Sequence, residues 1–346
     1  MKRRHLLGGM LGMAAVAAGS RRAWAAGGPP LNLLVAGPDG GQTSRWANAC
    51  ALAISPGLPG TPSIVPQPVG GLDGVTGANQ LDALVVPDGK TAAILPGLAL
   101  IAYLTGDSRV HFDPTHWVPL LAGVNSGVLM LRGTAPKADI AALRAGQPLR
   151  LAADQPQSRD LAAMLGLARL GIGTAPVFSL RDTDAKIRAF IDGEVDAVFL
   201  CGEGVPEDIA PLTAAGAVPF FSIGALGANG TNGPDALFPG LADARSLGPA
   251  VAPELDAAYQ AAAAAAQLDF LLVLPKLADP VAAANWTQAA TQAATSPALL
   301  AAASASSISL QPAPALAGAL ATLAISPAVQ GSMLAYLAKN CGWQPS

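Results

Sequence analysis

The chain carries its candidate chemistry in short polar turns that follow apolar runs. The first turn follows the apolar run 31–36 and consists of Gly40, Gly41, Gln42, Thr43 and Ser44. A helix is expected to start at Thr43 or Ser44, and the first N–H groups of a helix are unpaired donors at the positive end of its dipole. This turn can therefore bind a carboxylate through backbone donors and two hydroxyls. It also fits an ordinary strand-to-helix turn.

A second polar turn follows the strand-like run 197–200 and contains Cys201, Gly202 and Glu203. The carboxyl ends of parallel strands form the sheet edge at which open α/β folds bind ligands. Glu203 is thus a candidate partner for a ligand amine, and a solvent-facing turn is the alternative. Trp46 and Trp117 can line a cleft, but buried core positions are favoured.

Catalytic and metal-binding patterns are weak. His111 and His116 need further ligands from elsewhere, so a solvated loop is the preferred interpretation. The chain contains no nucleophile elbow and no phosphate loop with its lysine. Asp182 and Asp184 stand where a helix is expected to begin, which favours capping over catalysis. We expect no enzyme activity, no cofactor and no metal.

Composition excludes some partners. Charged residues make up 12% of the chain and the formal net charge is -3, so the sequence offers no attraction for nucleic acid. Prolines and Asp269 interrupt the later apolar runs, and none of them is expected to span a membrane. Cys50, Cys201 and Cys341 lack zinc-type spacing. One disulfide can form among them, with a pairing that the spacing leaves open, or all three are buried thiols.

The first twenty-five residues form an expected export signal. The pair Arg3-Arg4 precedes the uncharged stretch 6–20, and the small-residue exit ends at Ala25. This order favours the twin-arginine route, with the general secretory route or a retained anchor as alternatives. The mature protein is expected to begin near Ala26 and to be periplasmic.

Short strands and helices alternate along the mature chain, which predicts α/β lobes with parallel sheets covered by helices. Strands are expected at 31–36, 62–66 and 91–95, then at 149–152, 175–180, 197–200 and 218–223. The extended run 124–132 is expected to cross from one lobe to the other, and the run 218–223 to carry the chain back. Two crossings make a hinge above a cleft.

The remaining chain completes the first lobe. The segment 224–240 is glycine-rich and is expected to be a surface loop, with a ligand flap as the alternative. A helix over 252–267 contains six consecutive alanines, and a buried strand follows over 268–274. Four further helices are expected over 281–295, 297–303, 314–323 and 327–339, most of them started by prolines.

The order of these turns resembles the extracytoplasmic solute receptors of tripartite tricarboxylate transporters, known as Bug receptors. Seven short segments across most of the mature chain carry the resemblance: Gly40 to Arg45, Gly74 to Ala78, Pro87 to Thr91, Phe112 to Pro119, Asp192 to Asp196, Ala214 to Gly216 and Pro239 to Leu241. The resemblance implies a Venus flytrap of two α/β lobes that closes on a small organic acid and presents it to a permease.

The same resemblance places a second ligand-binding turn at 154–160. There it implies roles for Gln157, Ser158 and Arg159, and Arg181 is a possible compensating cation. The sequence departs from the family at Ser44, where an aspartate is usual, and in this turn, where Pro156 and two carboxylates replace glycines and serines. Carboxylates repel an anion, so the ligand can also be neutral, cationic or amphoteric.

Together these observations predict a type II periplasmic-binding-protein fold with extra C-terminal helices. We expect a first lobe of residues 26–128 and 225–346 and a second lobe of residues 129–224. The expected function is capture of a small polar molecule, an organic acid by preference, for membrane permease subunits, with the protein acting as a monomer. Two alternatives are a degenerate sensor or partner-binding module of the same fold, and a small exported hydrolase or transferase.

Overall fold

The computed structural model describes residues 29–133, 140–227 and 232–345. The predicted export signal and its cleavage site lie outside these residues, as does the middle of the glycine-rich loop. The sequence also predicts a helix over 137–145, whose first residues lie outside them as well. In the described segments, no single helix is long and apolar enough to cross a membrane.

A six-stranded mixed sheet forms the centre of the first lobe. Its strand order is β13-β4-β12-β3-β1-β2. The strands are β1 (Leu31–Val35), β2 (Ile64–Pro68), β3 (Thr91–Leu95), β4 (Val118–Val124), β12 (Leu268–Leu274) and β13 (Ser309–Pro312). Strand β1 pairs parallel with β2 and β3, but β12 runs antiparallel to β3 and β4, and β13 antiparallel to β4. The expectation of a wholly parallel sheet is therefore wrong for this lobe.

A five-stranded sheet in the order β7-β6-β8-β5-β9 forms the second lobe. Its strands are β5 (Gly127–Arg132), β6 (Leu149–Ala152), β7 (Thr174–Val177), β8 (Ala197–Cys201) and β9 (Ala217–Ser222). Strand β6 pairs parallel with β7 and β8, whereas β5 runs antiparallel to β8 and β9. The mixed pairing arises because β5 enters directly from the first lobe and has no crossover helix before it.

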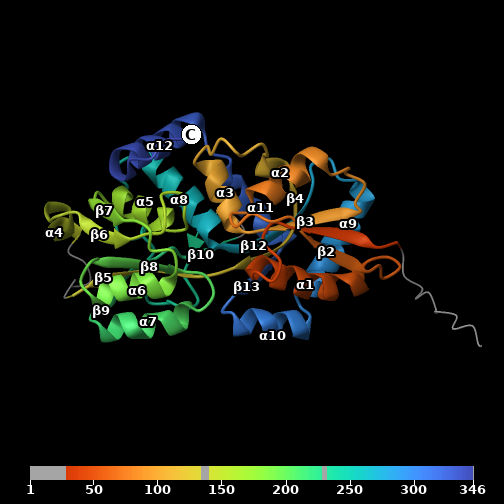
Figure 1. Ribbon diagram of the computed structural model, residues 1–346, viewed down its shortest axis with the longest axis horizontal. Helices are drawn as coiled ribbons and strands as arrows, with labels where there is room; N and C mark the ends of the chain where they lie inside the picture. Colours follow the sequence, from red (N-terminus) through yellow and green to blue (C-terminus); the bar gives the residue numbers. More distant parts are fainter. Residues whose placement is uncertain (1–28, 134–139, 228–231, 346) are drawn as a thin grey trace, which may run out of the picture.

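The two lobes are linked through adjacent chain segments, with the second lobe at the left of Figure 1. Strand β4 of the first sheet ends at Val124, and β5 of the second begins at Gly127. The chain returns after β9, near a short ribbon of β10 (Ala225–Leu226) and β11 (Asn232–Gly233). The two-lobe α/β fold class is confirmed, and the exact domain boundaries stay a prediction.

Helices cover both sheets, and some of them begin at a side-chain cap. They are α1 (Gln42–Ile54), α2 (Val75–Leu84), α3 (Gly97–Leu104), α4 (Ile140–Ala145), α5 (Leu161–Arg169), α6 (Thr183–Ile191), α7 (Val205–Ala214), α8 (Pro253–Gln267), α9 (Pro280–Ala293), α10 (Pro297–Ala305), α11 (Ala313–Leu323) and α12 (Pro327–Cys341). A capping Asp279, Ser296 or Ser326 precedes the proline that starts α9, α10 or α12. Each cap accepts from first-turn N–H groups, while proline lacks the donor that would be unpaired there.

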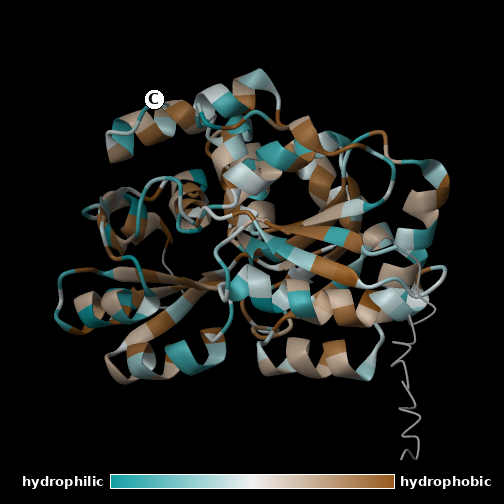
Figure 2. Cartoon of the chain, turned by 45° about the vertical axis from the view of Figure 1, so that its right-hand side comes forward, coloured by the Kyte–Doolittle hydropathy of each residue, from teal (hydrophilic) through white to brown (hydrophobic). Residues whose placement is uncertain are grey.

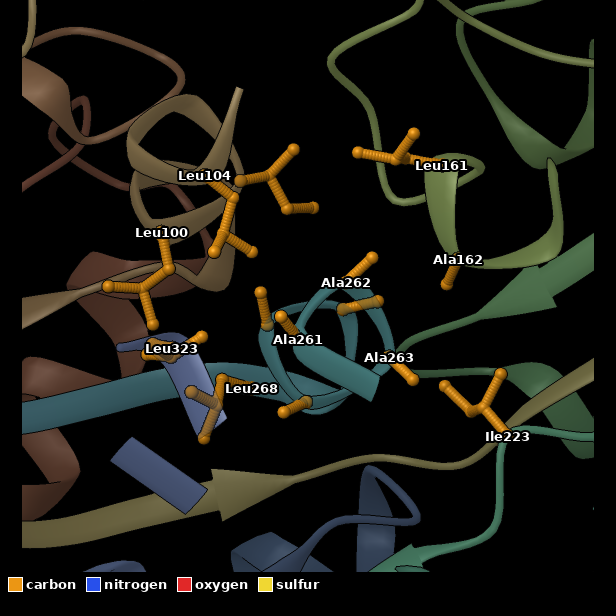
Figure 3. Packing of buried hydrophobic residues seen from close by; sticks show 14 of the residues in the cluster. Leu100, Leu104, Leu161, Ala162, Ile223, Ala261, Ala262, Ala263, Leu268 and Leu323 are labelled. Carbon is orange, nitrogen blue, oxygen red and sulfur yellow. The ribbon is translucent and has the colours of Figure 1, made fainter. Parts of the chain in front are cut away.

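The alanine-rich helix α8 packs between α3 of the first lobe and α5 of the second. Figure 3 shows Ala261, Ala262 and Ala263 between Leu100 and Leu104 on one side and Leu161 on the other. Alanine favours the helix and its small side chain lets both neighbours approach closely. We call this contact of α3, α8 and α5 the apolar seam, because its buried side chains join the cores of the two lobes into one cluster.

Gly97 permits the closest approach within the apolar seam. A Cβ atom at this first residue of α3 would lie 2.1 Å from the Ala265 carbonyl oxygen and 2.6 Å from that of Leu268. Both obstacles are backbone atoms, which cannot turn away as a side chain can.

Figure 2 shows strands that are mainly hydrophobic and helices that carry both hydrophobic and hydrophilic residues. This distribution matches sheets that are buried beneath layers of helices.

Several elements differ from the sequence expectation. The helices α3 and α7 and the strands β4 and β13 were not predicted, and α1 starts after Gly41 rather than at a Thr43 or Ser44 cap. The glycine-rich loop is only partly a surface excursion, since Asp235 is buried and accepts a hydrogen bond from the Ser126 hydroxyl at 2.7 Å. That contact ties the loop to the segment that joins the lobes.

Candidate ligand-binding site between the lobes

A buried carboxylate, Asp269, lies between the starts of α1 and α5. Its side chain is 0% exposed. The Gln42 amide at the start of α1 donates to its two oxygens at 2.6 and 2.7 Å, and Arg159, just before α5, approaches one oxygen at 3.5 Å. Asn125, from the segment that joins the lobes, lies at the same 3.5 Å distance. The two helix starts therefore face one another across a carboxylate of the protein itself.

Burial raises the pKa of Asp269 above its ordinary value. The nearby Arg159 guanidinium opposes this change, while the charge of Glu203 adds to it. The ionised form is disfavoured because the interior replaces water poorly as a partner for charge. A second anion placed beside Asp269 would meet the same penalty together with repulsion.

Glu203 ties the second lobe to α1 of the first. Its Oε2 atom lies 2.8 Å from Arg45 Nη2, and its Oε1 atom accepts from the Trp46 indole N–H at 2.9 Å. Trp46 is otherwise a buried core residue, as is Trp117. The contacts of Gln42, Arg45, Arg159, Glu203 and Asp269 form a second junction between the lobes, which we call the polar seam.

The predicted first turn is engaged in part, because the Gly40 N–H donates to the Asp39 carboxylate at 2.9 Å and the Gly41 N–H donates to the Pro38 carbonyl at 3.2 Å. No side chain caps α1, whose N-cap is Gly41, and Gly40 takes a left-handed φ of +70°. Thr43 and Ser44 are buried, and their hydroxyls make no hydrogen bond with another described residue. The adjacent Gln42 side chain, in contrast, is engaged with Asp269. The role of this turn in ligand binding stays a prediction.

The predicted second turn is occupied by its own carboxylate. Asp160 accepts from the Ser158 hydroxyl at 2.9 Å and from the Asp154 N–H at 3.0 Å, and it pairs with Lys186. Gln157 instead reaches the first lobe, where its amide lies 3.3 Å from both Thr105 Oγ1 and Asp107 Oδ2. The helix start that was expected to receive a ligand anion is thus already neutralised from within.

A hollow of about 320 Å³ adjoins this turn. Leu98 of α3 lines it from the first lobe, and Phe199 and Cys201 of β8 line it from the second. Ser158 and Thr183 also line it, and the remaining lining consists of three carboxylates and three cations: Asp154, Asp160, Asp182, Arg159, Arg181 and Lys186. Its volume suits a small molecule.

Two of these charges remain without a partner. Asp160 pairs with Lys186, Arg159 approaches Asp269, and Asp182 caps α6 by accepting from the Ala185 N–H, as predicted. The side chains of Arg181 and Asp154 make no hydrogen bond or ion pair with the rest of the described chain. They are the groups of the hollow that remain available to a ligand.

The pKa of Asp154 is raised, first by burial and then by the charge of Asp160. Lys186 and Arg181 oppose the rise through their positive charges. A cationic group bound beside Asp154 would stabilise its ionised form, as an anion beside Arg181 would be stabilised by the guanidinium.

Sequence reasoning missed Asp269, Asn125 and the free charge of Asp154. The signal for Asp269 was visible, because a lone aspartate within an otherwise apolar buried strand needs polar partners. Among the described residues no cluster suited to a metal ion occurs, and Cys50, Cys201 and Cys341 are free thiols. Burial raises the pKa of the Cys201 thiol to about 12, so this thiol is a poor nucleophile.

No protein-family model and no curated protein matches the chain. Solved structures do resemble it. A TctC solute-binding protein from Polaromonas superimposes with a TM-score of 0.67 at 16% identity, covering 90% of this chain and 98% of that one. The chain has the fold of these solute-binding proteins. The periplasmic binding protein BugD gives a TM-score of 0.54 at 15% identity and covers 91% and 98%. MatC from Rhodopseudomonas palustris, solved with malate, gives 0.52 at 15% identity and covers 89% and 97%.

Proposed function

We propose that this protein is an extracytoplasmic solute receptor that holds a small carboxylate-bearing molecule in the hollow between its lobes. The observation that supports this most directly is the unpaired guanidinium of Arg181. It lines a hollow to which both lobes contribute residues. Guanidinium groups bind carboxylates through paired charge-assisted hydrogen bonds. A fold shared with solute-binding proteins adds to the case.

The hollow limits the charge that such a ligand can carry. Asp154, Asp160 and Asp182 all line it, so a second or third carboxylate on the ligand would meet repulsion. This favours a solute with one carboxylate over a tricarboxylate. We propose that the protein binds this solute without chemistry.

Delivery to a membrane permease completes the proposed role. The predicted export signal supports a periplasmic location, and the resemblance to receptors of tripartite tricarboxylate transporters supports a monomer that docks on permease subunits. Co-purification of the protein with a large and a small permease subunit, dependent on added solute, would test this partnership.

Thermal unfolding with a panel of organic acids and amino acids tests the binding role. A ligand at one hundred times its Kd stabilises the folded state by about 2.7 kcal/mol, which raises Tm by several degrees. Arg181→Gln should abolish the shift. Arg188→Gln changes an exposed arginine on α6, the helix that begins two residues after Arg181, and should preserve the shift. A shift that survives Arg181→Gln would contradict the proposed site.

A degenerate binding module is the second candidate, and the polar seam favours it. Glu203 joins the lobes through Arg45 and Trp46, and Asp269 joins them through Gln42 and Arg159, so closure does not require a ligand. A protein of this kind would give no thermal shift with any member of the panel. It would still bind a protein partner, which co-purification can detect.

A further inference from the structure

A pair of opposite charges is fixed in position beside the hollow. Asp154 follows β6, and Arg181 follows the loop after β7. The Ser179 N–H donates to the Asp154 carbonyl at 2.9 Å, and the Leu180 N–H donates to the Ala153 carbonyl at 3.1 Å. The two loops are thereby joined, and the free carboxylate and the free guanidinium are held near one another without a direct ion pair.

Backbone strain in the same loop accompanies this arrangement. Ser179 has a φ of +74°, a left-handed conformation that L-residues other than glycine adopt at a cost. The hydrogen bond from its N–H to Asp154 contributes to holding that conformation. Ser179 lies two residues before Arg181, and strained residues of this kind cluster at ligand-binding sites.

A second hollow of about 380 Å³ lies beside the first and shares Asp154 and Arg181 with it. Pro156, Phe178 and Trp343 supply its apolar and aromatic lining. Phe178 and Trp343 are half-buried, and the Trp343 indole N–H has no partner elsewhere in the described segments. The charge pair thus stands where a polar hollow meets an aromatic one.

We propose that the ligand is an aromatic α-amino acid, an inference that rests on the proposed receptor function. Its carboxylate pairs with Arg181, its ammonium group pairs with Asp154, and its ring lies against Phe178 and Trp343. A plain carboxylate leaves Asp154 without a partner, and a plain amine leaves Arg181 without one. An amphoteric head satisfies both, and stacking against aromatic side chains selects a flat ring.

The test uses isothermal titration and tryptophan fluorescence with four probes. L-phenylalanine carries all three features, whereas 3-phenylpropionate lacks the ammonium group, 2-phenylethylamine lacks the carboxylate and L-alanine lacks the ring. Phenylalanine should bind about tenfold or more tightly than each of the others, since each loses a charge-assisted or aromatic contact.

Matched variants locate the binding. Arg181→Gln and Asp154→Asn should each weaken phenylalanine binding about tenfold or more. Trp343→Ala should weaken it with little effect on alanine binding, and Trp343→Phe should restore it. Arg188→Gln and Asp192→Asn change exposed charges at the end of α6 and should leave the affinity unchanged. Thermal unfolding of each variant verifies that it is folded.

The outcomes separate the inference from the proposed function. Binding of a simple carboxylate through Arg181, with no gain from the ring or the ammonium group, would overturn the amino-acid inference and leave the receptor function standing. Phenylalanine binding that is insensitive to Arg181, Asp154 and Trp343 would overturn the inference as well. Absence of binding by every probe and by the organic-acid panel would overturn both.

Discussion

The lobes meet along two junctions of opposite character. In the apolar seam, alanines of α8 pack against leucines of α3 and α5 in a region that is buried throughout. In the polar seam, Asp269 and Glu203 contact Gln42, Arg45 and Arg159. Apolar burial stabilises in proportion to area, whereas the exposed Arg45–Glu203 pair contributes little and the burial of Asp269 carries a desolvation cost. The difference assigns most of the cohesion between the lobes to α8 and leaves the polar side available for a ligand.

The C-terminal helices reinforce the apolar seam. Helix α11 packs on α8 and on β4 of the first lobe, and α12 packs on α8 and on β7 of the second. The Tyr336 hydroxyl of α12 lies 2.9 Å from the Thr174 hydroxyl of β7. Since both helices pack on α8, they brace the two lobes against each other. Motion between the lobes is therefore expected to be limited and to occur mainly at the polar seam.

Gly97→Ala should have the largest effect, because it breaks the apolar seam. The new Cβ would lie 2.1 Å from a backbone carbonyl oxygen of α8. Relief requires α3 to move away from α8, and we expect a loss of about 3 kcal/mol or more in the free energy of unfolding, measured by urea titration. Gly331→Ala is the matched control. Gly331 lies within α12, and a Cβ atom there would meet no atom within 4 Å. The substitution should therefore raise the free energy of unfolding by about 0.5–1 kcal/mol.

Sequence reasoning located the alanine-rich helix of the apolar seam but not its partner α3. The run from Gly97 to Leu104 is apolar almost throughout, so it lacks the polar face that would reveal helical periodicity. Helix caps were easier to predict from the sequence, because an aspartate or serine before a proline accepts hydrogen bonds from residues only two or three positions away. Asp182 was predicted as a cap and is one.

The polar seam was less predictable for a different reason. Turn composition predicted a binding role for Gly40 to Ser44, and the family resemblance implied one for Ser158, but neither could reveal that Asp160 would fill the second turn. Nor could it show that Asp269, more than 200 residues from Gln42, would lie opposite it. Such contacts depend on how two lobes with separate sheets are packed together. Local sequence patterns do not encode that arrangement.

Asp269→Asn should change the free energy of unfolding by an intermediate amount, and it should stabilise the protein where Gly97→Ala destabilises it. Burial raises the pKa of Asp269, so its ionised form is disfavoured in the folded protein. Stability that the protonated form provides is fully present below the unfolded-state pKa of about 4 and is lost as pH rises through the folded pKa. Because asparagine does not ionise, the variant does not undergo this loss of stability. The variant should be more stable than the wild type near neutral pH by the order of 1 kcal/mol, the scale of a buried polar exchange.

Urea titrations at several pH values measure this difference. It should shrink toward zero as the pH falls toward about 4, where the wild-type carboxyl regains its proton. Asp279→Asn is the control, because it keeps the cap of α9 at an exposed position far from the seam. A destabilised Asp269→Asn variant at neutral pH would mean that the attraction between Asp269 and Arg159 outweighs the cost of burial.

Glu203→Gln should have the smallest effect on stability, and it tests the polar seam most directly. Glutamine can still accept from Trp46 but cannot form the ion pair with Arg45, which is 58% exposed. Exposed ion pairs contribute below about 1 kcal/mol, and a double-mutant cycle with Arg45→Gln should return a coupling of that size that falls with salt. Small-angle X-ray scattering should give an unchanged radius of gyration, because the apolar seam still holds the lobes together. An expanded particle would show that Glu203 is the principal contact keeping them closed, and would transfer to the polar seam the cohesive role assigned to α8.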